Sequence, residues 1–240
     1  MVTPLPLSQT DAEIVDPDSD GQPMADNTIQ FRWITVIQYN LAWLFADNSE
    51  IFVAGDLFWY PVENNNKLRQ FPDVMVVFGV AKGDRGYYQQ WKENNIAPQV
   101  VFEILSPGNT AKEMNRKLLF YDRYGVEEYY LYDPQKNTFT GWLRLEPWLE
   151  IIDEMNGWVS PRLGIKFELT EETLMLYRAD GQPFRDYIEV EQQLEVSESR
   201  ATAAEEQLLQ ERQAKEIGQE RAKRLEELLR EAGIDPYGNE

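Results

Sequence analysis

The chain has 240 residues, a formal net charge of -19, and neither cysteine nor histidine. The two missing residue types exclude disulfides, thiolate or imidazole metal sites, cysteine nucleophiles and every mechanism that needs a histidine base. Any metal ion must therefore bind to oxygen atoms, which suits Mg²⁺, Mn²⁺ or Ca²⁺. Because no apolar run is long enough for a membrane span and the first residues are acidic, we expect a cytoplasmic protein that does not bind membranes.

The acidic charge is concentrated towards the two ends of the sequence. Residues 1–26 carry six acids and no base, and residues 185–240 carry fifteen acids against eight bases. Prolines scattered among the first acids predict a disordered lead-in over residues 1–27. The length then allows one domain over residues 28–183. Since most of the negative charge lies outside that domain, the charge alone does not exclude a nucleic-acid substrate.

The first half of the domain reads as a helix followed by two strands. Apolar residues three and four positions apart predict an amphipathic helix over residues 29–45 that packs on a sheet. The runs at 51–61 and 73–80 are typical of strands, and the polar tract at 63–70 between them indicates a turn. We therefore predict a hairpin here.

The second half begins with a strand, a helix and another strand. VVFEIL (100–105) predicts a buried strand, residues 111–124 predict a helix that ends at Gly125, and EEYYLYDP (127–134) predicts the next strand. This order over about 35 residues is typical of a βαβ unit, so we expect a parallel or mixed sheet with the helix on one face. Alternating aromatic and polar residues beyond Pro134 predict shorter antiparallel strands that complete the sheet.

Residues 184–240 predict a long charged helix, because Glu, Gln, Ala, Arg and Leu dominate and no proline occurs before Pro236. With Tyr187 as heptad position a, the a and d positions form an apolar seam interrupted by four residues, Ser197, Glu211, Lys215 and Gly218. Such a seam fits a coiled coil, for example in a homodimer, and it equally fits a single exposed helix with a weak apolar stripe.

Three charged residues stand out within the domain. Asp73 begins a predicted strand, Glu103 interrupts the apolar run of another, and Lys117 lies on the helix that follows. Each has an ordinary explanation, as a strand-start residue, an edge residue facing solvent or a surface lysine. Together they suggest a site, because a carboxylate within an apolar strand is costly unless it is paired, and two carboxylates on neighbouring strands can hold one divalent ion.

The runs FPDVMVV, VVFEILSPGNT and K-x-x-x-Y followed by GVEEYYLYDP are similar to those of the Uma-type family of endonucleases. This branch of the PD-(D/E)xK superfamily has a restriction-endonuclease-like α/β fold, a mixed sheet flanked by helices, and the resemblance covers about residues 28–180. It implies that Asp73 and Glu103 are the motif acids and metal ligands. The superfamily's lysine is expected at Leu105, and its absence there implies that Lys117 takes the role. The further candidates are Asp56 and Glu113 for an additional acid and Tyr121 as a neighbour of the lysine.

The implied activity is hydrolysis of DNA phosphodiester bonds with Mg²⁺ or Mn²⁺ as cofactor. The alternative is a catalytically silent nuclease-like fold that acts as a binding or assembly module through its C-terminal helix. A glycosidase would also use two carboxylates, but it leaves Lys117 unexplained. Four basic residues flank the Asp73 strand and are either phosphate contacts or a solvated loop: Lys67, Arg69, Lys82 and Arg85.

Overall fold

The computed structural model describes residues 27–233, so the predicted lead-in lies, apart from Asn27, outside the described residues. The chain divides into two compact units between Asp186 and Tyr187, and each is described by itself. None of the helices within the described range is both long enough and apolar enough to span a membrane. The elements of the first unit are α1 (Thr28–Leu44), β1 (Ile51–Gly55), β2 (Trp59–Tyr60), β3 (Val74–Phe78), β4 (Tyr88–Gln89), η1 (Gln90–Lys92), β5 (Val100–Ile104), α2 (Ala111–Arg123), β6 (Glu128–Asp133), β7 (Thr138–Leu145), β8 (Trp148–Ile151), β9 (Lys166–Leu169) and β10 (Leu174–Tyr177).

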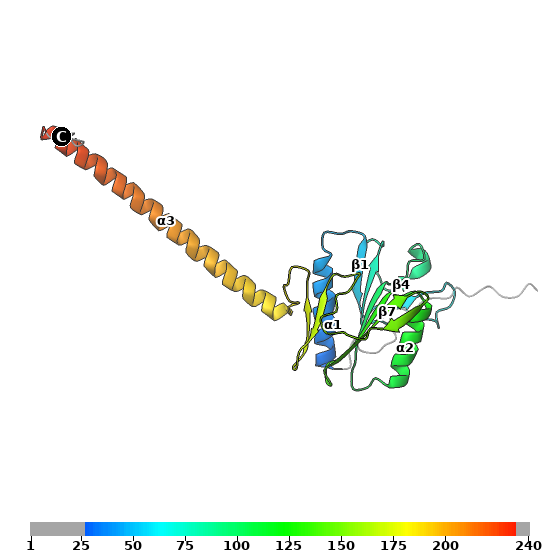
Figure 1. Cartoon of the computed structure of the whole chain (residues 1–240). Helices are drawn as coiled ribbons and strands as arrows, with labels where there is room; N and C mark the ends of the chain where they lie inside the picture. The colour runs from blue at the N-terminus through cyan, green and yellow to red at the C-terminus, as the bar shows by residue number, and fades with distance from the viewer. Residues whose placement is uncertain (1–26, 234–240) are drawn as a thin grey trace, which may run out of the picture. The chain divides into compact units, whose positions relative to one another are not determined.

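The centre of the first unit is a six-stranded sheet with the order β1-β3-β5-β6-β7-β8. The neighbours β5 and β6 are parallel, and helix α2 connects them along the chain. The other neighbouring strands of this sheet are antiparallel. The predicted mixed α/β sheet flanked by helices is therefore confirmed (Figure 1).

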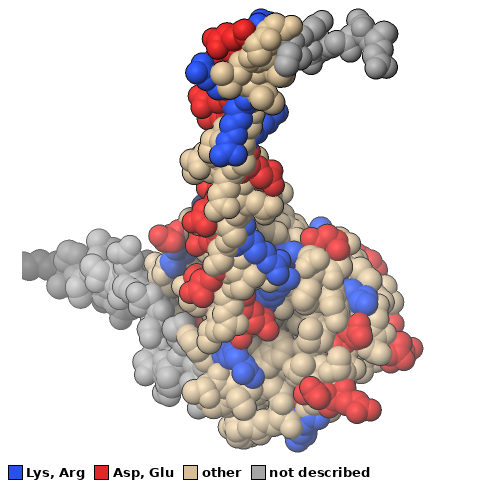
Figure 2. Space-filling view, turned by 90° about the vertical axis from the view of Figure 1, so that its left-hand side faces the viewer, with Lys and Arg blue, Asp and Glu red and all other residues tan. Residues whose placement is uncertain are grey.

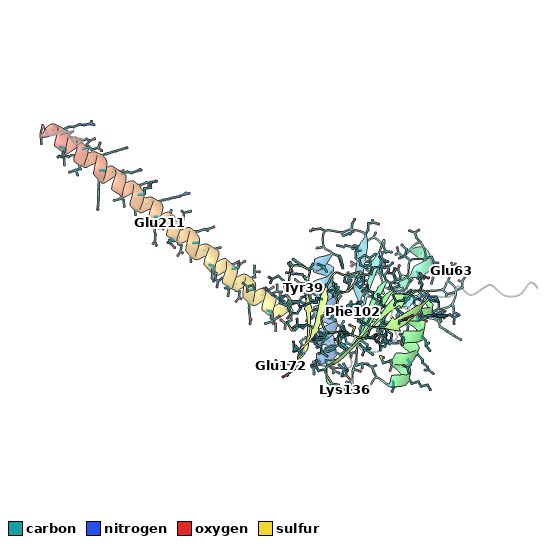
Figure 3. The ribbon with its side chains drawn as sticks, viewed as in Figure 1. Tyr39, Glu63, Phe102, Lys136, Glu172 and Glu211 are labelled. Atoms are coloured by element: carbon teal, nitrogen blue, oxygen red, sulfur yellow. The ribbon has the colours of Figure 1, made fainter. Side chains whose placement is uncertain are left out.

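The two faces of the sheet are covered by different elements. On one face, Ile37 and Leu41 of α1 pack with Phe102 of β5 and Phe167 of β9. On the other face, α2 and the short β2 and β4 strands contribute side chains to a second cluster. Figure 1 shows α1 and α2 on opposite sides of the sheet, and Figure 3 shows Phe102 inside the unit. Each fully buried Leu or Ile contributes roughly 1.5–3 kcal/mol through burial.

Local sequence signals fix the ends of both helices. Asn27 caps α1 by accepting hydrogen bonds from the backbone N–H groups of Ile29 and Gln30. Thr110 caps α2 by accepting from Glu113 N. After α2, Gly125 adopts a φ of 91°, the left-handed conformation that glycine tolerates best, as the sequence predicted.

Two details of the predicted strands are wrong. The run at 51–61 is not one strand, because Asp56 adopts a φ of 52° and turns the chain between β1 and β2. Strand β2 then pairs in parallel with β4, outside the main sheet. The last two strands also do not complete the main sheet, because β9 and β10 form a separate two-stranded sheet that packs over the α1 face.

The second unit is the helix α3 (Tyr187–Glu231), which has 45 residues and no buried side chain. Figure 2 shows acidic and basic side chains along α3 with uncharged surface between them, and Figure 3 shows Glu211 projecting from the helix. A helix this long with no buried face has no packing within its own unit to stabilise it.

Candidate active site

The sheet register brings Asp73 and Glu103 together. Strands β3 and β5 are antiparallel with Val74 opposite Phe102, so the next pair along the register is Asp73 and Glu103. Side chains on directly opposite residues lie about 5 Å apart at Cβ. Both carboxylates are buried, with 7% of Asp73 and 2% of Glu103 exposed. Two acidic groups therefore share one desolvated position on the α2 face of the sheet.

Asp73 is held by the backbone of the neighbouring strand. The N–H group of Ile104 donates to Asp73 Oδ2 at 2.6 Å. Burial and the nearby Glu103 charge raise the pKa of Asp73 to about 8, although Lys117 and the Ile104 N–H group oppose the shift. The carboxylate is therefore fixed in place but lacks enough positive charge to keep it fully ionised at neutral pH.

Helix α2 supplies two groups that hold Glu103. Lys117 Nζ lies 2.7 Å from Glu103 Oε2, and the Tyr121 hydroxyl donates to Oε1. Residues 117 and 121 are one helical turn apart, which places both on the same face of α2. Burial raises the pKa of Glu103, and Lys117 counteracts that rise. Both oxygens of this carboxylate are thus hydrogen-bonded.

Lys117 is the cation of the site. Its side chain is only 14% exposed, and its Nζ also lies 3.5 Å from the carbonyl oxygen of Phe71. Burial lowers the pKa of Lys117, but the charges of Glu103 and Asp73 outweigh burial, and the pKa is raised overall. Lys117 therefore stays protonated and balances one of the two carboxylates.

Aromatic side chains enclose the site. The Tyr121 ring stacks on Trp59 at 6.3 Å between centroids, and it contacts Tyr129 of β6 at 5.1 Å. The Tyr129 hydroxyl is buried and has no hydrogen-bond partner among residues 27–233. Tyr121 in turn donates to Glu103, and burial followed by the charges of Glu103 and Asp73 raises the pKa of Tyr129. An ordered water or a substrate oxygen would satisfy the Tyr129 hydroxyl.

The two further acids from the sequence lie near the pair. The backbone N–H of Asp56 donates to the carbonyl oxygen of Asp73 at 3.1 Å, and the Asp56 charge contributes to the raised pKa of Asp73. Glu113 accepts a hydrogen bond from Asn109 at 3.4 Å, and its charge contributes to the raised pKa of Glu103. The described residues nevertheless contain no set of three or more acidic side chains placed to share one metal ion.

The predicted basic contacts mostly serve other parts of the fold. Lys82 donates to the carbonyl oxygens of Phe45 and Ala46 at the end of α1. Two of the others stack on aromatic rings, with Arg85 over Phe52 and Arg69 over Phe58. Arg85 is also paired with Glu93 at 3.0 Å, and Lys67 is exposed. Contacts within the chain therefore hold three of these four side chains in place.

Tyr129, Gln30 and Glu128 are among the buried polar residues that were not identified from the sequence. Tyr129 belongs to the site. Gln30 of α1 donates to the carbonyl oxygen of Ile104, directly beside the acid pair, at 3.0 Å. Glu128 lies elsewhere, where it accepts hydrogen bonds from Ser160, Tyr130 and the Arg162 N–H group. A signal existed for Glu128, since it is an acid at the start of an apolar strand, as Glu103 is an acid within one.

The donor set suits one hard divalent cation. Asp73 and Glu103 supply carboxylate oxygens, and Lys117 neutralises only one of the two charges. Asp73 Oδ2 carries the side chain's single hydrogen bond from the described residues. Mg²⁺ is commonly bound by one or two carboxylates together with water and substrate phosphate, so two protein ligands are sufficient. The residues present therefore fit Mg²⁺ or Mn²⁺.

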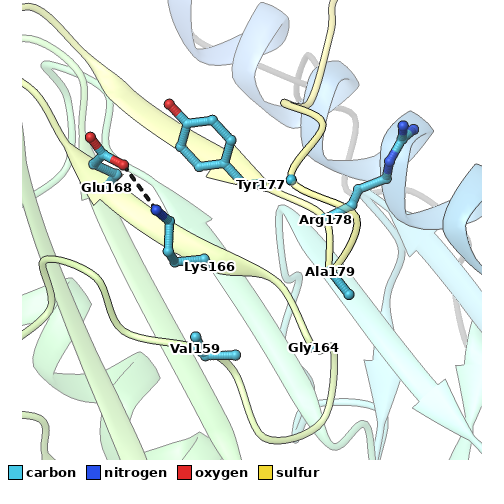
Figure 4. Close-up of a pocket in the computed structure, with 8 residues that line it drawn as sticks. Val159, Gly164, Lys166, Glu168, Tyr177, Arg178 and Ala179 are labelled. Atoms are coloured by element: carbon cyan, nitrogen blue, oxygen red, sulfur yellow. Dashed lines mark hydrogen bonds and ion pairs between the residues drawn. The ribbon is translucent and has the colours of Figure 1, made fainter.

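A second feature of the first unit is a surface pocket of about 620 Å³ between the β9–β10 hairpin and the loop before it (Figure 4). Lys166 and Glu168 form an ion pair at 3.2 Å across its wall, and Arg178 pairs with Asp180 at 3.3 Å. Its charges are thus paired within the chain, and the pocket contains no residue of the acid site.

Two of three comparisons with known proteins find a match for this chain. The model of the Uma2 family, whose description reads "Putative restriction endonuclease", matches residues 21–170, more than half of the chain. Among solved structures, a crystal structure described as "a putative nuclease belonging to DUF820" from Anabaena variabilis ATCC 29413 is similar at 17% identity and a TM-score of 0.42, covering 56% of this chain and 72% of that chain. A search of curated proteins finds no match.

Proposed function

The chain belongs to the Uma2 family, whose description reads "Putative restriction endonuclease", and from this premise we propose that it hydrolyses phosphodiester bonds of DNA with Mg²⁺ or Mn²⁺ held by Asp73 and Glu103. The observation that carries the proposal is the buried group formed by these two carboxylates and Lys117. Asp73 directly precedes β3, Glu103 lies in β5 and Lys117 lies in α2. Burying these charged groups costs free energy through desolvation, so their presence in the core favours a functional role.

Each protein residue has a distinct role in this proposal. Asp73 and Glu103 provide the ligands, and the Ile104 N–H and Tyr121 hydroxyl orient them. When bound, the metal ion would polarise the scissile phosphate and lower the pKa of a water molecule. Lys117 stays protonated and can neutralise charge on a phosphate oxygen beside the carboxylates. No residue of the chain can serve as an imidazole base, since histidine is absent.

The test is cleavage of circular DNA, because a circle has no ends for an exonuclease. Purified protein is incubated with supercoiled plasmid and with circular single-stranded DNA, in Mn²⁺, in Mg²⁺ and in EDTA, beside a structured RNA. We expect cleavage of DNA that requires the metal and falls by about 100-fold or more in Asp73→Asn and Glu103→Gln. The matched control is Glu168→Gln, which changes a partly exposed acid in the β9–β10 hairpin, away from the acid site.

The silent nuclease-like fold is the second candidate, and one observation favours it. Both oxygens of Glu103 are already occupied by Lys117 and Tyr121, so the site is satisfied on that side without a metal ion. Calorimetric titration with MnCl₂ separates the two functions. A catalytic site gives saturable binding that Asp73→Asn abolishes, whereas a silent fold gives no specific binding and no cleavage.

A further inference from the structure

Helix α3 carries an unpartnered apolar seam. None of its 45 residues is buried, and half or more of Leu194, Leu208 and Leu225 is exposed. An isolated helix gains little stability without a packed apolar face. The seam positions a and d, counted from Tyr187, are Tyr187, Val190, Leu194, Ser197, Ala201, Ala204, Leu208, Glu211, Lys215, Gly218, Ala222, Leu225, Leu229 and Ala232.

The polar residues in the middle of the seam select an arrangement of two copies. In a parallel pair each position faces itself, so Glu211 would face Glu211 and Lys215 would face Lys215 within the seam. In an antiparallel pair an a position faces a d position. When the alignment is centred between residues 211 and 215, Glu211 faces the partner's Lys215 and both charges are compensated.

The same alignment matches side-chain sizes along the rest of the seam. It places Leu194 opposite Ala232, Ala201 opposite Leu225, and Leu208 opposite Gly218 in the partner. Ser197 faces Leu229, and Ala204 faces Ala222. Large residues facing small ones allow two helices to pack closely. A shift by one heptad places Glu211 opposite Leu208 or Ala222 instead, which leaves a charge against an apolar residue.

The charge along α3 also favours antiparallel pairing. Residues 187–210 contain six acids and one base, whereas residues 211–231 contain six of each. A parallel pair would place the two acidic halves side by side, and an antiparallel pair places each acidic half beside a balanced one. Like charges that lie side by side repel each other, so this charge distribution disfavours the parallel pair.

We propose that α3 forms an antiparallel coiled coil with a second copy of the chain, centred on two ion pairs between Glu211 and the partner's Lys215. The paired segment runs from Leu194 to Ala232 and is about 58 Å long at roughly 1.5 Å per residue. The two chains enter it from opposite ends. The proposal rests on α3 alone and does not depend on the nuclease activity.

Cysteine cross-linking of the full chain tests the orientation, because the sequence contains no other cysteine. Ala204 and Ala222 are exposed alanines that face each other only in the antiparallel pair. We expect the double variant Ala204→Cys/Ala222→Cys to give a disulfide-linked dimer on oxidation, whereas neither single variant does. The two positions are about 27 Å apart within one helix, so a bond inside one chain is excluded.

Three results would contradict the antiparallel pair. Sedimentation of the unmodified chain as a monomer at all concentrations, or absence of a cross-link in the double variant, overturns the proposal. A cross-linked dimer of Ala204→Cys alone indicates parallel pairing and also overturns it.

A charge exchange tests the central ion pairs separately. Lys215→Glu is expected to raise the dimer dissociation constant by about 10-fold or more, because two acids then face each other at both central layers. The exchange variant Glu211→Lys/Lys215→Glu restores the pairing and with it the affinity. In a parallel dimer like charges face each other in the unmodified chain and in Lys215→Glu alike, so an unchanged dissociation constant in Lys215→Glu contradicts the proposal, as does failure of the exchange variant to restore affinity.

Discussion

Asp73 makes the stability of the metal-free protein depend on pH. Its pKa is about 8 in the folded chain and about 3.9 in an unfolded one. A carboxyl group with a raised folded-state pKa stabilises the fold fully below the unfolded pKa, and this contribution is lost as the pH rises through the folded pKa. The Asp73 contribution to the free energy of unfolding should therefore fall between about pH 4 and pH 8.

The measurement is urea unfolding in EDTA across this pH range, for the unmodified chain and for Asp73→Asn. The asparagine keeps the hydrogen bond from Ile104 but does not titrate. We expect the unmodified chain to lose more stability with rising pH than the variant does. Parallel profiles for the two proteins would show that the Asp73 carboxyl does not titrate in this window.

Lys117 should be strongly coupled to Glu103 in stability as well as in activity. Lys117→Met removes the ammonium group that pairs with a carboxylate only 3% exposed. Breaking a buried ion pair from one side costs about 3 kcal/mol. The double variant Glu103→Gln/Lys117→Met removes both charges and should be less destabilised than the sum of the single variants. Additive free energies of unfolding, measured in urea at pH 8, would contradict this coupling.

At the scale of elements, the Glu128 network ties strand β6 to the loop before β9. Ser160 donates to Glu128 Oε2 and accepts from the N–H of Leu163 at 2.9 Å. Ser160→Ala leaves the buried carboxylate with one donor fewer, which costs about 1–3 kcal/mol. The network shares no residue with the acid site, so DNA cleavage per folded molecule should be unchanged.

The pH dependence of this loss has a definite sign. Burial raises the pKa of Glu128, and the Ser160 hydrogen bond opposes the rise because it favours the ionised form. Removing that bond raises the pKa further, so Ser160→Ala should cost more stability at pH 8 than at pH 5. The unfolding free energy of both proteins at the two pH values tests this, and an equal loss at both would show that the ionisation of Glu128 does not change between pH 5 and pH 8.

The elements were predictable where the signal is local. The helices α1 and α2 follow from apolar spacing and capping residues, and β5 follows from its apolar run. The separation of β9 and β10 from the main sheet was not predictable, because their alternating residues fit either partner strand. The turn at Asp56 was missed for a similar reason, since the apolar residues on both sides of it are typical of one continuous strand.

Part of the candidate site could be predicted, because a charged residue within an apolar run of the sequence indicates a special role. Glu103 lies in an otherwise apolar strand, Asp73 begins a neighbouring strand and Lys117 lies on the helix that follows, and the resemblance to an endonuclease family added Tyr121. Tyr129 could not be assigned in the same way. Its proximity to Glu103 depends on the parallel pairing of β5 with β6, and its sequence neighbourhood contains two other tyrosines at positions 130 and 132.

At the scale of the whole molecule, the acid site lies within a chain whose charge of -19 opposes association with DNA. In the proposed function, positive charge at the reacting phosphate would therefore come from the site itself. Lys117 provides one such charge, and the two carboxylates can recruit a divalent cation for the rest. The proposed activity therefore depends on a bound divalent cation.

The most direct test is the nicking of supercoiled plasmid by the purified full chain in Mn²⁺, in EDTA, and with Glu103→Gln in Mn²⁺. We expect nicking in the first reaction and at least about 100-fold less in the other two. The Glu103→Gln protein should remain folded, which circular dichroism can show. Nicking at an equal rate in EDTA, or by Glu103→Gln in Mn²⁺, would contradict metal-dependent cleavage at the acid site.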